Sequence, residues 1–143
     1  MSAIAKMPSL DSPAPGSHAA KILIAEDHLD SRDALRILLE AAQYQVVVAA
    51  DGRAAMAAAI EESPDLILMD IMMPELDGLE VTRRLRQHQA TSKIPIIAVT
   101  AMEGGHRLAL EAGADDYLSK PINIRLLLNK ITGLLDHHDA EEQ

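Results

Sequence analysis

Short apolar runs alternate with longer, helically periodic segments along most of this 143-residue chain. The short runs have about the length of β-strands and are mostly rich in leucine or β-branched residues. They predict strands at residues 21–25, 45–49, 65–69 and 94–99, and a weaker one at 115–119. Apolar residues between the runs recur at helical spacing, as at Leu35, Leu38, Leu39 and Ala42. The same spacing and high helix propensity predict further helices at residues 53–60, 79–85, 105–112 and 124–135.

This alternation of five strands with five helices predicts an α/β fold. Because right-handed crossovers place helices on both faces of a parallel sheet, we expect a three-layer, doubly wound, five-stranded parallel sheet. In such sheets, ligands bind beyond the carboxyl ends of the strands, where the strand order reverses. The chemistry of the chain is therefore expected at that edge.

The length of the chain fits one domain with a substantial core, and a second folded domain does not fit. Residues 1–18 are rich in Ser, Pro, Ala and Gly, so we interpret them as a flexible leader. The folded domain is expected at residues 19–137, followed by an acidic tail at 138–143. Phe and Trp are absent and there are two tyrosines, so aliphatic side chains must form the core.

The charge and composition exclude several kinds of partner. A formal charge of −9 disfavours a nucleic-acid backbone or an anionic membrane as the main partner. No apolar run approaches the roughly 20 residues that span a bilayer. The absence of cysteine excludes disulfides and thiol chemistry and is typical of a reducing compartment, so we expect the cytoplasm.

Polar side chains stand where the predicted strands end: Glu26, Asp27, Asp70, Thr100 and Lys120. Any one of them could merely cap a helix or shape a turn. Taken jointly, three carboxylates at one edge would repel each other unless a cation compensates. Hard oxygen ligands with no His or Cys favour Mg²⁺ or a similar ion, which is usually bound by one or two carboxylates together with phosphate oxygens. A lysine could neutralise such a phosphoryl group.

Five motifs in this order resemble the receiver domain of bacterial response regulators. They are residues 22–27 (ILIAED), 65–74 (DLILMDIMMP), 77–78 (DG), 99–101 (VTA) and 113–121 (GADDYLSKP). The resemblance covers residues 21–135 and implies a flavodoxin-like (βα)5 fold. It also implies a phospho-accepting function in two-component signalling or a phosphorelay.

The resemblance assigns the chemistry residue by residue. Asp70 would take a phosphoryl group from a phosphohistidine. Asp27 and Asp70 would bind Mg²⁺ or Mn²⁺, with Glu26 acting through a metal-bound water and Met72 offering its backbone carbonyl. Lys120 would pair with the phosphoryl group. The resemblance thus implies no enzyme beyond the self-assisted phosphorylation and dephosphorylation of Asp70.

The resemblance also implies a conformational switch. Thr100 would hydrogen-bond the phosphoryl group and draw its loop inward. Tyr117 would then turn inward and remodel the face formed by the fourth helix, fifth strand and fifth helix, although an ordinary half-buried tyrosine is an open alternative. Pro121 matches a position where the family often has a cis peptide, whereas the sequence alone favours trans. The segment from Thr100 to Tyr117 is about two residues shorter than in most receivers, and the pair Gly104-Gly105 could preserve its mobility.

The implied partners are a histidine kinase or histidine phosphotransfer protein upstream and a protein target downstream, with a phosphorylation-dependent homodimer left open. Two alternatives remain: a segment of a larger hybrid kinase or multidomain regulator, and a constitutive docking module. A phosphatase of the haloacid dehalogenase type would need an aspartate at Met72 as general acid. We interpret His28 as a solvated loop histidine, and Met69, Met72 and Met73 as packing residues.

Overall fold

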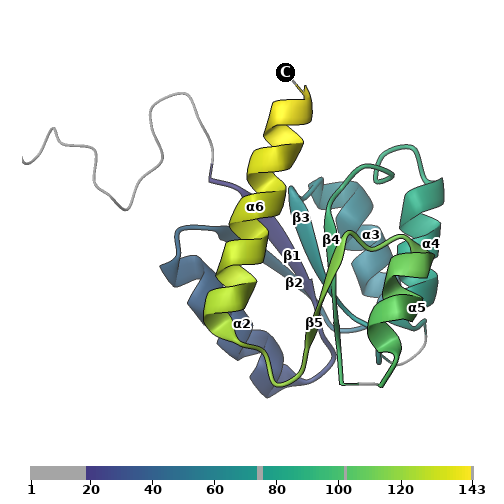
Figure 1. The fold of residues 1–143 in the computed structure, drawn as a ribbon, viewed down its shortest axis with the longest axis horizontal. Helices are drawn as coiled ribbons and strands as arrows, with labels where there is room; N and C mark the ends of the chain where they lie inside the picture. Colours follow the sequence, from purple (N-terminus) through teal and green to yellow (C-terminus); the bar gives the residue numbers. More distant parts are fainter. Residues whose placement is uncertain (1–18, 74–75, 102, 143) are drawn as a thin grey trace, which may run out of the picture.

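The computed structural model describes residues 19–73, 76–101 and 103–142. Its centre is one parallel sheet with the strand order β2-β1-β3-β4-β5 (Figure 1). The strands are β1 (Lys21–Ala25), β2 (Gln45–Ala49), β3 (Leu66–Asp70), β4 (Ile96–Thr100) and β5 (Asp116–Ser119). This confirms the predicted α/β class. The order reverses between β1 and β3, which identifies where a ligand is expected.

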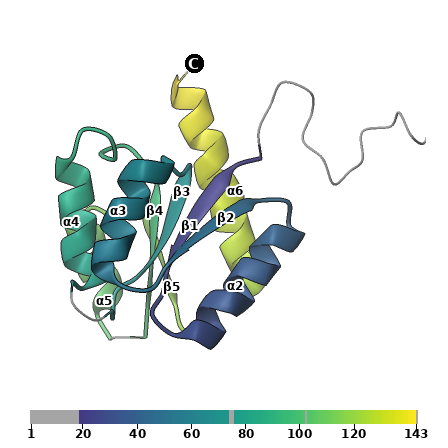
Figure 2. The ribbon, with the colours of Figure 1, turned by 180° about the vertical axis from the view of Figure 1, so that it is seen from behind.

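Helices cover both faces of the sheet, as the two opposite views show (Figures 1 and 2). One face carries α2 (Leu29–Ala41) and α6 (Ile124–Glu142), and the other carries α3 (Gly52–Glu62), α4 (Gly78–Gln87) and α5 (Gly105–Ala112). The three predicted layers are therefore present. Among the described residues, no helix has the length and apolar character that crossing a bilayer demands.

Alternate residues of each buried strand pack against opposite helical layers. Along β1, Ile22 and Ile24 face the cluster that includes Leu127 of α6, whereas Leu23 and Ala25 face the cluster formed with α3, α4 and α5. All of β3 and β4 is buried. Two-sided burial explains why these strands read as continuous apolar runs in the sequence.

Several predicted boundaries differ from the structure. The fourth strand begins at Ile96 instead of residue 94, because Ile94 belongs to a turn in which its N–H donates to Thr91 O at 3.2 Å, and Pro95 has no N–H. Strand β3 includes Asp70 because it stays in register with Val99 of β4. Helix α6 continues to Glu142, beyond the predicted end at 135, and the Ala-Glu-Glu stretch there has high helix propensity. The predicted leader lies outside the described residues.

Candidate functional site

The polar residues singled out in the sequence lie at the carboxyl ends of the strands. Asp70 is the last residue of β3 and is 2% exposed, while Glu26 directly follows β1 and is 3% exposed. Thr100 ends β4 and is also buried, and its carbonyl accepts a hydrogen bond from the N–H of Lys120 at 3.0 Å. Because the strands are parallel, the carboxyl ends of β1, β3, β4 and β5 lie along one edge of the sheet, and these side chains gather there.

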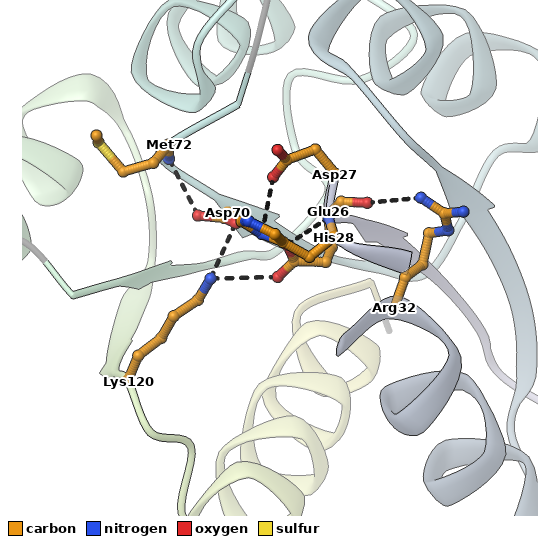
Figure 3. A network of polar contacts seen from close by, with 7 residues as sticks. All are labelled: Glu26, Asp27, His28, Arg32, Asp70, Met72 and Lys120. Carbon is orange, nitrogen blue, oxygen red and sulfur yellow. Dashed lines mark hydrogen bonds and ion pairs between the residues drawn. The ribbon is translucent and has the colours of Figure 1, made fainter. Parts of the chain in front are cut away.

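Lys120 joins two buried carboxylates at this edge. Its Nζ lies 3.0 Å from Asp70 Oδ2 and 3.3 Å from Glu26 Oε1 (Figure 3). The Lys120–Pro121 peptide bond is cis, so the trans form favoured by the sequence alone is wrong, and the form suggested by the resemblance is present. The structure therefore places a cation between two acidic groups that would otherwise repel each other.

The other oxygens of the cluster differ in how they are bound. Asp70 Oδ1 accepts a hydrogen bond from the backbone N–H of Met72 at 3.0 Å. Asp27 Oδ1 is buried and, although His28 Nδ1 lies 3.4 Å away, it has no hydrogen-bond partner. A buried oxygen without a hydrogen bond is costly unless another group compensates. The carbonyl of Met72 as a metal ligand stays a prediction.

His28 takes part in the cluster more directly than the sequence suggested. Its ring is 70% exposed, as expected of a loop histidine, but Nδ1 lies 3.1 Å from Glu26 Oε2. The backbone N–H of His28 donates to the same oxygen at 3.0 Å. Arg32, which the sequence analysis did not single out, donates from Nη1 to the carbonyl of Glu26 at 3.1 Å. The position of His28 directly after the acidic pair was the available signal.

The pKa values of the two buried carboxyls shift in opposite directions, although Lys120 acts to lower both of them. Burial raises the pKa of Asp70 above its usual value, and the hydrogen bond from Lys120 only partly offsets this. Burial also acts to raise the pKa of Glu26, but the backbone N–H of His28 and the charge of Lys120 outweigh it, so that pKa is lowered. The pKa of Lys120 is raised: burial opposes its charge, but Asp70 and then Glu26 more than compensate.

The acidic cluster fits a divalent cation. Glu26, Asp27, His28 and Asp70 each offer one ligand atom, and these atoms all lie within 4.8 Å of one another. Asp27 Oδ1 has no hydrogen-bond partner that a metal ion would have to displace. Carboxylate oxygens at a partly open edge are the ligands that Mg²⁺ prefers.

The candidate switch residues Thr100 and Tyr117 both lie close to α5. A Cβ atom built on Gly105, the first residue of α5, would stand 2.8 Å from Thr100 Oγ1 and 2.9 Å from its Cγ2. Gly105 therefore allows α5 to touch Thr100, a role in addition to the mobility expected from the sequence. The half-buried Tyr117 ring contacts the ring of His106, with centroids 4.9 Å apart and planes tilted by 33°, and Lys130 Nζ lies 5.8 Å from the Tyr117 ring centroid.

Comparison with known proteins agrees with this geometry. The sequence model of the response regulator receiver domain matches residues 22–132. The chain belongs to the response regulator receiver family. It is 40% identical over 118 residues to the response regulator PleD of Caulobacter vibrioides, a match that covers 81% of this chain but 26% of PleD. Several other curated relatives are matched over about half of their length.

Solved receiver structures share the fold along nearly their whole length. A CheY-like receiver domain protein from Methanospirillum hungatei JF-1 is 32% identical, with a TM-score of 0.80 over 86% of this chain and 98% of that one. The receiver domain of sensor histidine kinase PA1611 from Pseudomonas aeruginosa PAO1 is 33% identical, with a TM-score of 0.78 over 82% and 98%. That structure has a magnesium ion coordinated in its active-site cleft.

Family membership establishes the general function. The chain is a phospho-accepting receiver of two-component signalling, and the dehalogenase-type and docking-module alternatives are not favoured. Receiver domains are phosphorylated by histidine kinases, bind Mg²⁺ at an acidic pocket and are in general signalling modules without a separate enzymatic activity.

Proposed function

We propose that Asp70 is the phosphoacceptor of this receiver. The observation that supports it is the buried Asp70 carboxylate held 3.0 Å from Lys120 Nζ at the switch point of the sheet. One carboxylate oxygen attacks the phosphorus of a phosphohistidine on a histidine kinase or phosphotransfer protein. The phosphorus–nitrogen bond breaks as the phosphorus–oxygen bond forms, giving an acyl phosphate. Lys120 Nζ at 3.0 Å stabilises the ionised form of Asp70, and this form attacks without a base to remove a proton.

The surrounding residues support this transfer by position and charge. Lys120 neutralises a phosphoryl oxygen as negative charge spreads over the transferring group, and the Met72 N–H holds the second oxygen of Asp70 in place. Asp27 and Asp70 would bind Mg²⁺ or Mn²⁺ directly, and Glu26 through a water. When bound, the metal ion supplies positive charge next to the phosphoryl oxygens. Lys120 contacts both buried carboxylates and balances part of their charge.

We further propose that Thr100 and Tyr117 carry the signal away from Asp70. Thr100 hydrogen-bonds the phosphoryl group and moves inward, and α5 follows because its first turn contacts the Thr100 side chain. Tyr117 then leaves its contact with His106 and changes the surface of α5, β5 and α6. A downstream protein reads that surface, and a homodimer formed on phosphorylation is the second candidate reader. The cytoplasm, the usual location of receiver domains, is the proposed location of this reaction.

The proposal is tested by phosphorylating the chain without a kinase. The native chain is incubated with a small-molecule phosphodonor, with Mg²⁺ or with a chelator, and its intact mass is measured. We expect the mass of one phosphoryl group to be added in the presence of Mg²⁺ only. Asp70→Asn should gain none, while the control Asp30→Asn, an exposed aspartate on α2, should gain as the native chain does. Equal labelling of the native chain and Asp70→Asn would refute the assignment.

A further inference from the structure

His28 brings a nitrogen ligand to an acidic cluster that otherwise offers only oxygen. Its Nδ1 lies 3.1 Å from Glu26 Oε2 and 3.4 Å from Asp27 Oδ1, and Figure 3 shows the dashed contact between the ring and Asp27. These four side chains supply ligand atoms within 4.8 Å of one another. The imidazole therefore reaches the place where a metal ion would be held.

We infer that His28 sets the metal preference of the site, serving as an additional ligand for divalent transition metals such as Co²⁺, Ni²⁺, Cu²⁺ and Zn²⁺. The inference rests on the proposed metal site at Asp27 and Asp70. Imidazole suits these borderline metals, whereas Mg²⁺ favours oxygen and water ligands. The receiver should therefore favour transition metals over Mg²⁺ more strongly than a site made of carboxylates alone.

The local hydrogen bonds allow the ring to change partners. Glu26 Oε2 already accepts the backbone N–H of His28 at 3.0 Å, so the oxygen keeps a donor when the ring leaves. Lys120 holds the other oxygen of Glu26. As Nδ1 binds a metal ion, the ring proton resides on Nε2, the ordinary alternative tautomer of neutral imidazole. The ring is 70% exposed, so this rearrangement leaves no cavity behind.

A merely structural role for His28 predicts a different result. If the ring only positioned Glu26, its loss would weaken the binding of every metal by a similar factor. If the ring is a ligand, its loss weakens the binding of transition metals and leaves Mg²⁺ binding unchanged. The ratio of two affinities therefore separates the two roles, and it requires no phosphorylation.

The test compares Co²⁺ and Mg²⁺ binding in three proteins. All carry His137→Gln and His138→Gln, which remove an adjacent histidine pair from the C-terminal segment. One has no other change, the second adds His28→Gln, and the control adds His88→Gln, an exposed histidine in the segment after α4. Co²⁺ binding is followed by visible absorption and Mg²⁺ binding by competition. Cu²⁺ is added for electron paramagnetic resonance, which detects a bound imidazole nitrogen.

We expect His28→Gln to weaken Co²⁺ binding by at least about tenfold, a typical cost of perturbing a metal site. Mg²⁺ binding should not change. The signal of a nitrogen bound to Cu²⁺ should be lost in the His28→Gln protein and kept in the other two. Equal weakening of Co²⁺ and Mg²⁺, or an unchanged nitrogen signal, would overturn the inference. Failure of the proposed function would instead appear as absent Asp70 labelling in the native chain, whatever the cobalt result.

Discussion

Replacing Gly105 by alanine should destabilise the receiver, although alanine is the better helix former. The new Cβ would meet both branches of the Thr100 side chain, at 2.8 and 2.9 Å, so no rotation of that side chain avoids it. Overpacking of this kind costs about 1–3 kcal/mol, and two short contacts place Gly105→Ala in the upper half of that range. The higher helix propensity of alanine offsets about 0.5–1 kcal/mol of this loss. The expected net loss is about 1–2.5 kcal/mol.

A double-mutant cycle, measured by urea unfolding without metal or phosphodonor, isolates the contact. In a Thr100→Ala background the nearest remaining atom is the Cβ of residue 100, at 3.3 Å, so Gly105→Ala should cost clearly less than in the native background. Gly104→Ala is the matched control. Gly104 has φ of +79° and no neighbour within 4 Å of a built Cβ, so its cost should be equal in both backgrounds. An equal cost of Gly105→Ala in both backgrounds would refute the proposed contact.

Three further changes probe charge, anchoring and signal. Lys120→Met leaves two buried carboxylates without their cation and should lower the free energy of unfolding in urea by about 1–3 kcal/mol. This is less than the loss expected for a fully buried ion pair, because Lys120 is partly exposed. Added Mg²⁺ should reduce the loss, because it binds the folded state. Arg86→Ala removes hydrogen bonds to three carbonyls and to a carboxylate and should lower the free energy of unfolding by about 2–4 kcal/mol. The control Arg84→Ala loses an exposed ion pair with Glu80 and should change that free energy little. In Tyr44→Leu, Tyr117 is the remaining fluorescent aromatic, and its emission should change on phosphorylation.

Each of these three predictions can be contradicted independently of the others. A Mg²⁺-independent loss in Lys120→Met would argue against a metal site shared with Asp70. Equal losses in the two arginine variants would mean that the carbonyl contacts of Arg86 contribute little. Unchanged Tyr117 emission in a chain whose mass shows full phosphorylation would contradict the proposed switch, while leaving the phosphoacceptor assignment intact.

The sequence predicted the sheet and the gathering of acidic groups because both depend on local patterns. An apolar run followed by an acidic residue places Glu26 and Asp70 at strand ends, and parallel pairing then brings them together. The contact of His28 with its neighbours, the approach of Gly105 to Thr100 and the ring contact of His106 could not be predicted in this way. They depend on backbone direction in loops and on helix placement, which the periodicity of side chains does not encode.

The hydrogen bonds of Arg86 determine how α5 can move. Arg86 Nε donates to the carbonyl of Gly113 at 2.8 Å, and Nη2 contacts Asp115 Oδ2 at 2.7 Å, so the carboxyl end of α5 is tied to α4. The opposite end rests on Thr100. Helix α5 is about 12 Å long, and these contacts let it rotate about its end at Gly113. A shift of about 1 Å at Thr100 then corresponds to a tilt of about 5°. The first turn of α5 would be displaced most, so a partner that binds there would be the most sensitive to the shift.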